Sequence, residues 1–147
     1  MKTTLAIKIA VSAAICLATL SAAPAFAADL TVNLQGLRAQ TGLVKVALVD
    51  SQQAWDGKAA PVQATGAPPQ GEVAQFTFKD LKPGRYAVMI THDENGNGKM
   101  DMMLMPKEGF GFSRNPKIRF GPPKFADAAF VLAAGENRLA IKLSYFL

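Results

Sequence analysis

The segment that decides the fold reads LKPGRYAVMITHDENGNGKMD and spans residues 81–101. It begins with a Pro-Gly turn and continues as a strand from Arg85 to Thr91, in which β-branched and aromatic side chains are frequent. It ends in a polar loop with two Asn-Gly pairs, which favour tight turns. This succession of turn, strand and turn is typical of a β domain.

Stretches of the same character lie on both sides of this segment, separated by turns rich in Gly, Pro, Asn and Asp. Their polar and apolar residues alternate with the period of a strand, and no helical period is sustained. We expect strands at residues 29–34, 43–49, 73–78, 128–132 and 138–143, and an edge strand in the proline-containing stretch at 62–65.

The connections suggest how these strands follow one another. The turn at residues 40–42 favours a hairpin between the first two strands, and residues 134–137 form the turn before the last strand. Residues 50–58 form a loop or one helical turn that places Trp55 against the sheet edge. The pattern predicts an all-β, antiparallel sandwich of about seven strands, with a small barrel as the competing architecture.

The N-terminus has the three parts of a secretory signal peptide. Lys2 and Lys8 are basic, residues 9–20 are apolar, and Ala25-Phe26-Ala27 is a small-x-small cleavage pattern. We expect cleavage after Ala27, which leaves residues 28–147 as a single exported domain in the periplasm or outside the cell. No second long apolar stretch follows, so the sequence predicts no transmembrane helix after cleavage.

Cleavage changes both the charge and the cysteine content of the chain. It removes Cys16, the one cysteine, and two lysines, so the net charge falls from +5 to +3. That charge is too mild to indicate a nucleic-acid partner. Without disulfides, the exported domain depends for its stability on its core or on a bound ion.

From Asp93 to about Lys124 the strand pattern fails, and long irregular segments in compact domains often carry function. The first part has the spacing D-x-N-x-N-G-x-x-D, with Gly98 at the sixth position, where a sharp turn is needed. Oxygens at alternate positions suit Ca²⁺. The predicted ligands are Asp93, Asn95, Asn97, the carbonyl of Lys99, and Asp101.

The match to a calcium loop is partial. Leu104 stands at the twelfth position, where an EF-hand has glutamate, and a strand precedes the loop instead of a helix. We therefore expect weak binding, with a dissociation constant of about 10⁻⁴–10⁻³ M. The alternative interpretation is a polar connection that turns through its Asn-Gly pairs without any metal.

The second part of the irregular segment, residues 109–125, mixes phenylalanines with basic residues. This composition suits a binding surface for an anionic partner, such as a periplasmic protein or a glycan. The predicted contacts are Phe110, Phe112, Arg114, Arg119 and Phe120. In the alternative interpretation the phenylalanines anchor the loop on the sandwich and the basic groups face water.

Catalytic motifs are not recognisable in the sequence. The single histidine, His92, lies beside Asp93, which leaves an enzyme centred on His92 as one hypothesis. No G-x-S-x-G, phosphate loop, dinucleotide fingerprint or zinc-ligand cluster accompanies it. The sequence therefore predicts a non-enzymatic protein.

The ordered motifs resemble one family across essentially the whole mature chain. They are the L-x-P-G-x-Y turn, the H-D-E-N-G-N-G-K-x-D loop, P-K-E-x-F-G-F-S at 106–113, and F-G-P-P-x-F-x-x-A-x-F at 120–130. The chain is identified on these motifs as a member of DUF2141, bacterial exported proteins of unknown function. The resemblance implies a Gram-negative periplasmic or secreted setting and an immunoglobulin-like or prealbumin-like sandwich.

The turn and loop alone also resemble prealbumin-like repeats of bacterial surface adhesins, in which such loops hold calcium. That resemblance carries over to Asp93, Asn95, Asn97 and Asp101 as ligands. Our leading hypothesis is an exported, non-enzymatic β-sandwich with a structural calcium loop at 93–101. The alternatives are an interaction module that uses residues 109–125 and the His92 enzyme.

Overall fold

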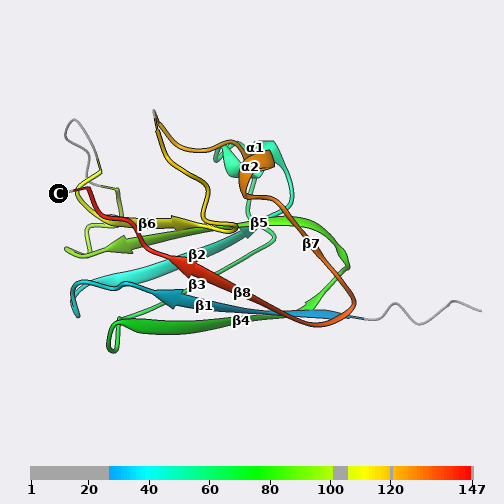
Figure 1. The fold of residues 1–147 in the computed structure, drawn as a ribbon, viewed down its shortest axis with the longest axis horizontal. Coiled ribbons are helices and arrows are strands. Elements are labelled where there is room, and N and C mark those ends of the chain that lie inside the picture. Colours follow the sequence, from blue (N-terminus) through cyan, green and yellow to red (C-terminus); the bar gives the residue numbers. More distant parts are fainter. Residues whose placement is uncertain (1–26, 101–105, 120, 147) are drawn as a thin grey trace, which may run out of the picture.

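Two β-sheets pack face to face in the computed structural model, which describes residues 27–100, 106–119 and 121–146 (Figure 1). The predicted signal peptide lies outside these residues except for Ala27, and the first strand begins at Ala28, directly after the predicted cleavage position. Within the described part of the chain, no helix has the length and apolar character that a membrane span requires.

The smaller sheet has three strands in the order β4-β1-β8. Its strands are β4 (Val73–Leu81), β1 (Ala28–Gln35) and β8 (Gly135–Lys142). The central strand β1 is antiparallel to β4 and parallel to β8, so the first and last strands of the chain lie side by side. This sheet therefore forms only when residues from both ends of the domain meet.

The larger sheet has the order β3-β2-β5-β6, and β7 pairs with the first residues of β5. Its strands are β3 (Gln63–Ala67), β2 (Leu43–Val49), β5 (Gly84–Asp93), β6 (Gly109–Phe112) and β7 (Phe130–Leu132). Two short helices, α1 (Gln52–Trp55) and α2 (Phe125–Ala128), lie together beside this sheet (Figure 1).

The core lies between the two sheets and is built by strict alternation along the strands. Apolar residues of β1 and β2 that point inward have 0–1% of their surface exposed: Leu30, Val32, Leu34, Val44, Val46 and Leu48. Phenylalanines of β4 and branched residues of β5 fill the remaining space. The predicted all-β sandwich is confirmed, and the sheets do not close into a barrel.

The L-x-P-G-x-Y motif forms the corner between the sheets. Only Lys82 and Pro83 separate β4, in one sheet, from β5, in the other. The Tyr86 hydroxyl donates to the carbonyl of Lys82 at 2.8 Å. A tyrosine that bonds back to the backbone a few residues upstream holds such corners in immunoglobulin-like sandwiches.

The expected hairpin between the first two strands is wrong, because β1 and β2 belong to different sheets. Their alternating apolar residues face one core from opposite sides, and periodicity alone does not distinguish this from side-by-side pairing. The connecting segment begins at Gly36 and ends at Gly42, whose positive φ angles of 84° and 77° carry the chain across the core edge.

Three further expectations differ from the structure. The turn expected at 134–137 before the last strand is wrong, because β8 begins at Gly135. The strand expected at 128–132 is split, because α2 ends at Ala128 and β7 begins at Phe130. The segment expected to be irregular contains β6. Its Gly-Phe-Gly-Phe sequence alternates like a strand, but glycine is uncommon in strands and so the pattern was not recognised. Glycine is needed at position 111 because a Cβ there would lie 2.9 Å from the Ile141 side chain.

Gly42 lies where β2 and β5 begin to pair, and a Cβ there would overlap the backbone carbonyl oxygen of Asp93. We expect Gly42→Ala to lower the free energy of unfolding by about 3 kcal/mol or more, from steric overlap added to left-handed strain. Gly57 is the matched control, because its φ is 70° and no atom lies within 4 Å of the place that a Cβ would occupy.

Urea denaturation measures the two variants side by side. Gly57→Ala retains the strain alone and should cost about 1 kcal/mol. Equal losses in the two variants would contradict the close approach of β2 to the end of β5.

Candidate functional site

The calcium-like loop leaves the sandwich where β5 ends, at a carboxylate that is almost fully buried. Asp93 is 1% exposed, and its Oδ2 lies 2.7 Å from the Nζ of Lys45 on the neighbouring strand β2. The backbone N–H of Gly98 donates to Oδ2 at 2.8 Å, and that of Asn97 donates to Oδ1 at 3.1 Å. The Lys45 ammonium, followed by these amides, holds the pKa of Asp93 below its ordinary value.

The next two polar side chains continue this arrangement along the loop. The Asn95 Oδ1 accepts from the N–H of Asn97 at 3.0 Å, and the Asn97 Oδ1 accepts from the N–H of Lys99 at 2.8 Å. Each side chain thus bonds the backbone two residues ahead, which is the turn that Asn favours. The side-chain oxygens at positions 93, 95 and 97 thus all accept from backbone N–H groups of the same loop.

This donor set is of the type that calcium prefers, because it consists of oxygens alone. The fit is incomplete in charge, since Lys45 already supplies a cation to Asp93. Asp101 lies outside the described residues. Among the described residues no group of three His, Cys, Asp or Glu side chains is close enough to hold a metal ion. The predicted calcium ligands therefore stay a prediction.

Arg38 closes the base of the same loop. Its guanidinium bonds both carboxylate oxygens of Glu94, at 2.8 and 3.0 Å, and the carbonyl of Lys107 at 2.8 Å. The bond from Arg38 holds the pKa of Glu94 below its ordinary value. One side chain thus joins the residues on either side of segment 95–106.

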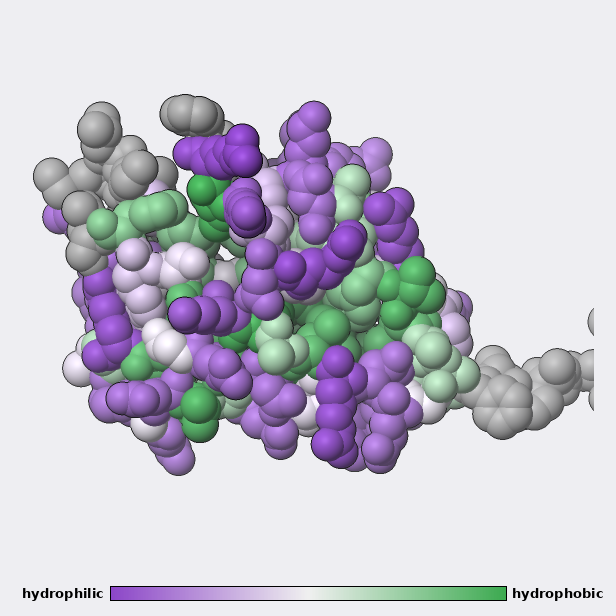
Figure 2. Space-filling model, viewed as in Figure 1, coloured by the Kyte–Doolittle hydropathy of each residue, from purple (hydrophilic) through white to green (hydrophobic). Residues whose placement is uncertain are grey.

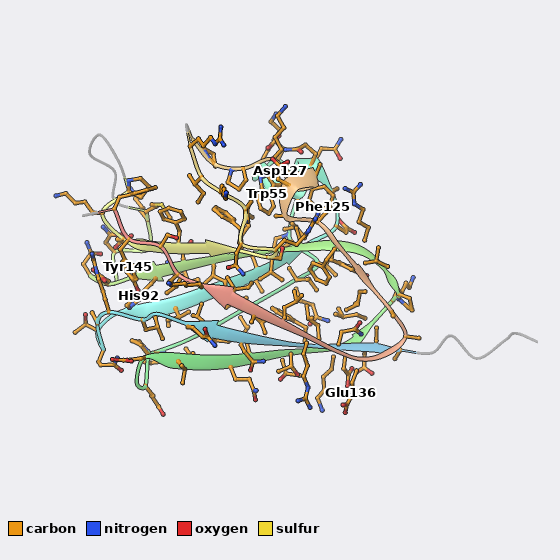
Figure 3. The ribbon with its side chains drawn as sticks, viewed as in Figure 1. Trp55, His92, Phe125, Asp127, Glu136 and Tyr145 are labelled. Atoms are coloured by element: carbon orange, nitrogen blue, oxygen red, sulfur yellow. The ribbon has the colours of Figure 1, made fainter. Side chains whose placement is uncertain are left out.

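His92 is fully buried and both ring nitrogens have partners in the protein. Nε2 lies 2.9 Å from the carbonyl of Thr41, which only accepts, so Nε2 carries the proton in this hydrogen bond. The Tyr145 hydroxyl then donates to Nδ1 at 2.9 Å. Figure 3 shows the two rings together at one end of the sandwich. This arrangement ties β5 to the C-terminal tail.

The phenylalanines predicted to contact a partner point inward where the structure describes them. Phe110 is 5% exposed, and the ring of Phe112 lies 5.4 Å from that of Trp55. Trp55 also packs edge-on against Phe125, with 6.3 Å between the rings (Figure 3). Phe120 lies outside the described residues. The described phenylalanines therefore anchor segment 109–125 on the larger sheet, as in the alternative interpretation.

Three basic residues of that segment line a surface hollow of about 530 Å³. Arg114, Lys117 and Arg119 contribute the positive charges, and Asp127 of α2 contributes a carboxylate. Prolines 116, 122 and 123 form much of the remaining wall. We call this feature the basic hollow. It brings together two predicted residues, Arg114 and Arg119, with Lys117, which the sequence analysis had not singled out.

Comparison with known proteins identifies the family. A model of uncharacterized proteins conserved in bacteria, DUF2141, matches residues 32–140. The chain belongs to the DUF2141 family. No curated protein and no solved structure matches it. The match covers β2 to β7, half of β1, most of β8, the loop and the basic hollow. The function of the family is unknown.

Three residues of the DUF2141 chain that organise the site were not identified from the sequence: Arg38, Lys45 and Tyr145. Each lies more than 45 positions from its partner at the site, so no local pattern points to it. Lys45 did carry a signal, because it is a charged residue in the middle of an otherwise apolar strand.

The Arg38–Glu94 pair predicts a pH dependence. Because the pKa of Glu94 lies below its ordinary value of 4.5, the pair stabilises the fold above that pH and loses this effect as the pH falls through the lowered pKa. Arg38→Gln should lower the free energy of unfolding at pH 7 by about 1 kcal/mol, since both side chains are partly exposed.

Between about pH 7 and pH 3, the free energy of unfolding measured in urea should therefore fall less steeply in Arg38→Gln than in the wild type. Arg138→Gln removes the same charge from an exposed position on β8 and serves as the control. A decline of equal steepness in all three proteins would contradict the assignment.

If phenylalanines anchor segment 109–125, substitutions of its phenylalanines and of its basic residues should change the free energy of unfolding by different amounts. Phe110→Ala should lower the free energy of unfolding by about 3–5 kcal/mol, because it empties a buried site. Arg119→Gln, at an exposed position, should change it by less than about 0.5 kcal/mol. Thermal unfolding compares the two, and a stable Phe110→Ala variant would return Phe110 to the candidate partner surface.

Proposed function

We propose that this DUF2141 protein is an exported, non-enzymatic β-sandwich in which loop 93–101 binds Ca²⁺ as a structural ion. The observation that carries the proposal is that side-chain oxygens at alternate positions all accept from backbone amides of the same loop. Asp93, Asn95 and Asn97 would supply side-chain oxygens, and Lys99 its carbonyl. Asp101 completes the proposed set from outside the described residues.

Lys45 supports this proposal and also limits the affinity. Its ammonium, 2.7 Å from Asp93, marks the carboxylate as a place where a positive charge is stabilised. The Lys45 side chain is 38% exposed, so its ammonium has access to water when a stronger cation takes its place. Calcium therefore competes with an internal cation, which agrees with weak binding.

A structural ion suits a domain that has lost its one cysteine with the signal peptide. An ion that binds only the folded form stabilises it by mass action, by about 1.4 kcal/mol when its concentration is ten times the dissociation constant. Export to the periplasm or beyond, with cleavage after Ala27, is part of the same proposal. The beginning of β1 at Ala28 supports that boundary.

The proposal that the protein is not an enzyme rests on the environment of His92. A general base needs a ring nitrogen that reaches a substrate. Here one nitrogen bonds the Thr41 carbonyl, the other bonds the Tyr145 hydroxyl, and the side chain is 0% exposed. His92 is also not among the residues that line the basic hollow.

A second candidate function is an interaction module that uses segment 109–125. The basic hollow favours it, because three cationic side chains face one concave surface. A periplasmic protein or a glycan with acidic groups is the kind of partner that this surface would take. The two candidate functions use different residues and are compatible in one protein.

Calcium competition gives a direct test of the first candidate. In chelator-treated protein, added calcium should raise the melting temperature, and Lys45→Met should bind calcium about tenfold more tightly because the competing ammonium is gone. Lys58→Met is the control, since Lys58 pairs with Asp56 on the surface. Calorimetric titration measures the affinities.

Lys45→Met also leaves Asp93 without its partner, so this variant should be less stable than the wild type until calcium is added. If neither the wild type nor Lys45→Met gains stability at millimolar calcium, the loop is a metal-free polar connection. A gain of equal size in the wild type and in Asp93→Asn would place the ion elsewhere.

A further inference from the structure

The basic hollow lies beside α2, and Ala126 and Asp127 of that helix form part of its wall. Figure 2 shows strongly hydrophilic side chains over the part of the molecule where segment 113–127 runs. Arg114, Lys117 and Arg119 are all exposed and all line the same hollow of about 530 Å³. A concave surface that gathers positive charge concentrates anions from solution.

Among the described residues, these positive charges are neutralised only in part. Among the described residues, no ion pair involves Arg114, Lys117 or Arg119. Asp127 is the one carboxylate among the residues that line the hollow, and one of its oxygens accepts the backbone N–H of Lys124. Three cationic groups against one carboxylate leave the hollow with a net positive charge.

The walls of the hollow are held in place before any ligand arrives. Arg114 and Asn115 adopt left-handed φ angles of 65° and 46°, a conformation that surrounding bonds must enforce. The Asn115 amide donates to the Ala140 carbonyl and accepts from the N–H of Lys142, both on β8. On the other wall, the Trp55 indole donates to the carbonyl of Pro123.

One of the cationic groups is itself oriented by the protein. The Nη1 of Arg114 donates to the carbonyl of Ala129 at 3.3 Å, which directs the guanidinium and leaves its other donors for a ligand. A guanidinium presents paired donors that match the oxygens of phosphate, and a preorganised guanidinium loses little freedom on binding.

We propose that the basic hollow binds a phosphate monoester, either as a soluble molecule or as a lipid headgroup. A dianion with three terminal oxygens engages two guanidinium groups and an ammonium at once, whereas a single carboxylate offers only two oxygens and one charge. The inference goes beyond the second candidate function, because it uses the same surface but names a phosphate group as the ligand in place of a protein or an acidic glycan. It is independent of the calcium loop.

Experiments with inorganic phosphate and with two kinds of vesicle distinguish a soluble phosphate ligand from a lipid headgroup. The purified protein is titrated with inorganic phosphate in the presence of a calcium chelator and at constant ionic strength, and backbone amide shifts are followed by NMR. Co-sedimentation then compares phosphatidylcholine vesicles with and without phosphatidic acid. Saturable shifts confined to residues 113–127 support phosphate binding, and sedimentation only with phosphatidic acid identifies the headgroup.

Two variants separate specific binding from general charge. Arg119→Gln removes a cation from the hollow and should weaken phosphate binding about tenfold, the effect of losing one charge-assisted hydrogen bond. Arg138→Gln makes the same charge change on β8, away from the hollow, and should bind like the wild type. Both variants should keep the wild-type melting temperature.

Three results would overturn the proposal: binding of neither phosphate nor phosphatidic acid, equal binding by wild type and Arg119→Gln, or the same shifts with chloride at matched ionic strength. Because calcium is chelated throughout, none of these results bears on the loop at 93–101. Conversely, a calcium loop that fails its own test leaves the phosphate measurement unaffected.

Discussion

A buried carboxylate has to be compensated, and the end of β5 is organised around this constraint. Asp93 keeps about one hundredth of its surface exposed and receives an ammonium and two backbone amides in return. Lys45 can reach it because β2 and β5 pair in one register, with Leu43 opposite Asp93. The amides reach it because the loop turns back sharply at Gly96 and Gly98, both with positive φ.

The short strand β6 connects this polar end with the basic hollow. At its beginning, Gly109 faces the ring of Tyr145 so closely that any Cβ would overlap the ring. At its end, Phe112 packs on Trp55, and Ser113 accepts from the N–H of Val88 while donating to the carbonyl of Ala128. A displacement of β6 would therefore disturb both candidate sites, although they share no residue.

The sequence predicted the parts of the fold that depend on residues close together in the chain. The strand at 85–91, the turn before it and the alternation at 29–34 follow from local sequence patterns, and all three match the structure. The pairing of the strands could not be predicted from the sequence, because the apolar residues of β1 and β2 alternate in the same way whichever sheet the strands join. Gly109 and Gly111 hid β6, since their role is to admit Tyr145 and Ile141.

The candidate sites divide in the same way. The spacing of Asp93, Asn95 and Asn97 is local, and their hydrogen bonds to the backbone follow directly from it. The charge that each site prefers also depends on groups from other elements. Lys45 of β2 lies beside Asp93, and Asp127 of α2 lies beside the arginines of the basic hollow. Such neighbours depend on the completed fold, which no spacing rule describes.

The parallel pairing of β1 with β8 also constrains the order in which the chain can fold. The central strand of the smaller sheet pairs with residues 135–142, which lie more than 100 positions further along the sequence. Contacts so distant in sequence form late, because the loop between them must close first. Until then β1 has an unpaired edge on the side away from β4, because β8 is its partner there.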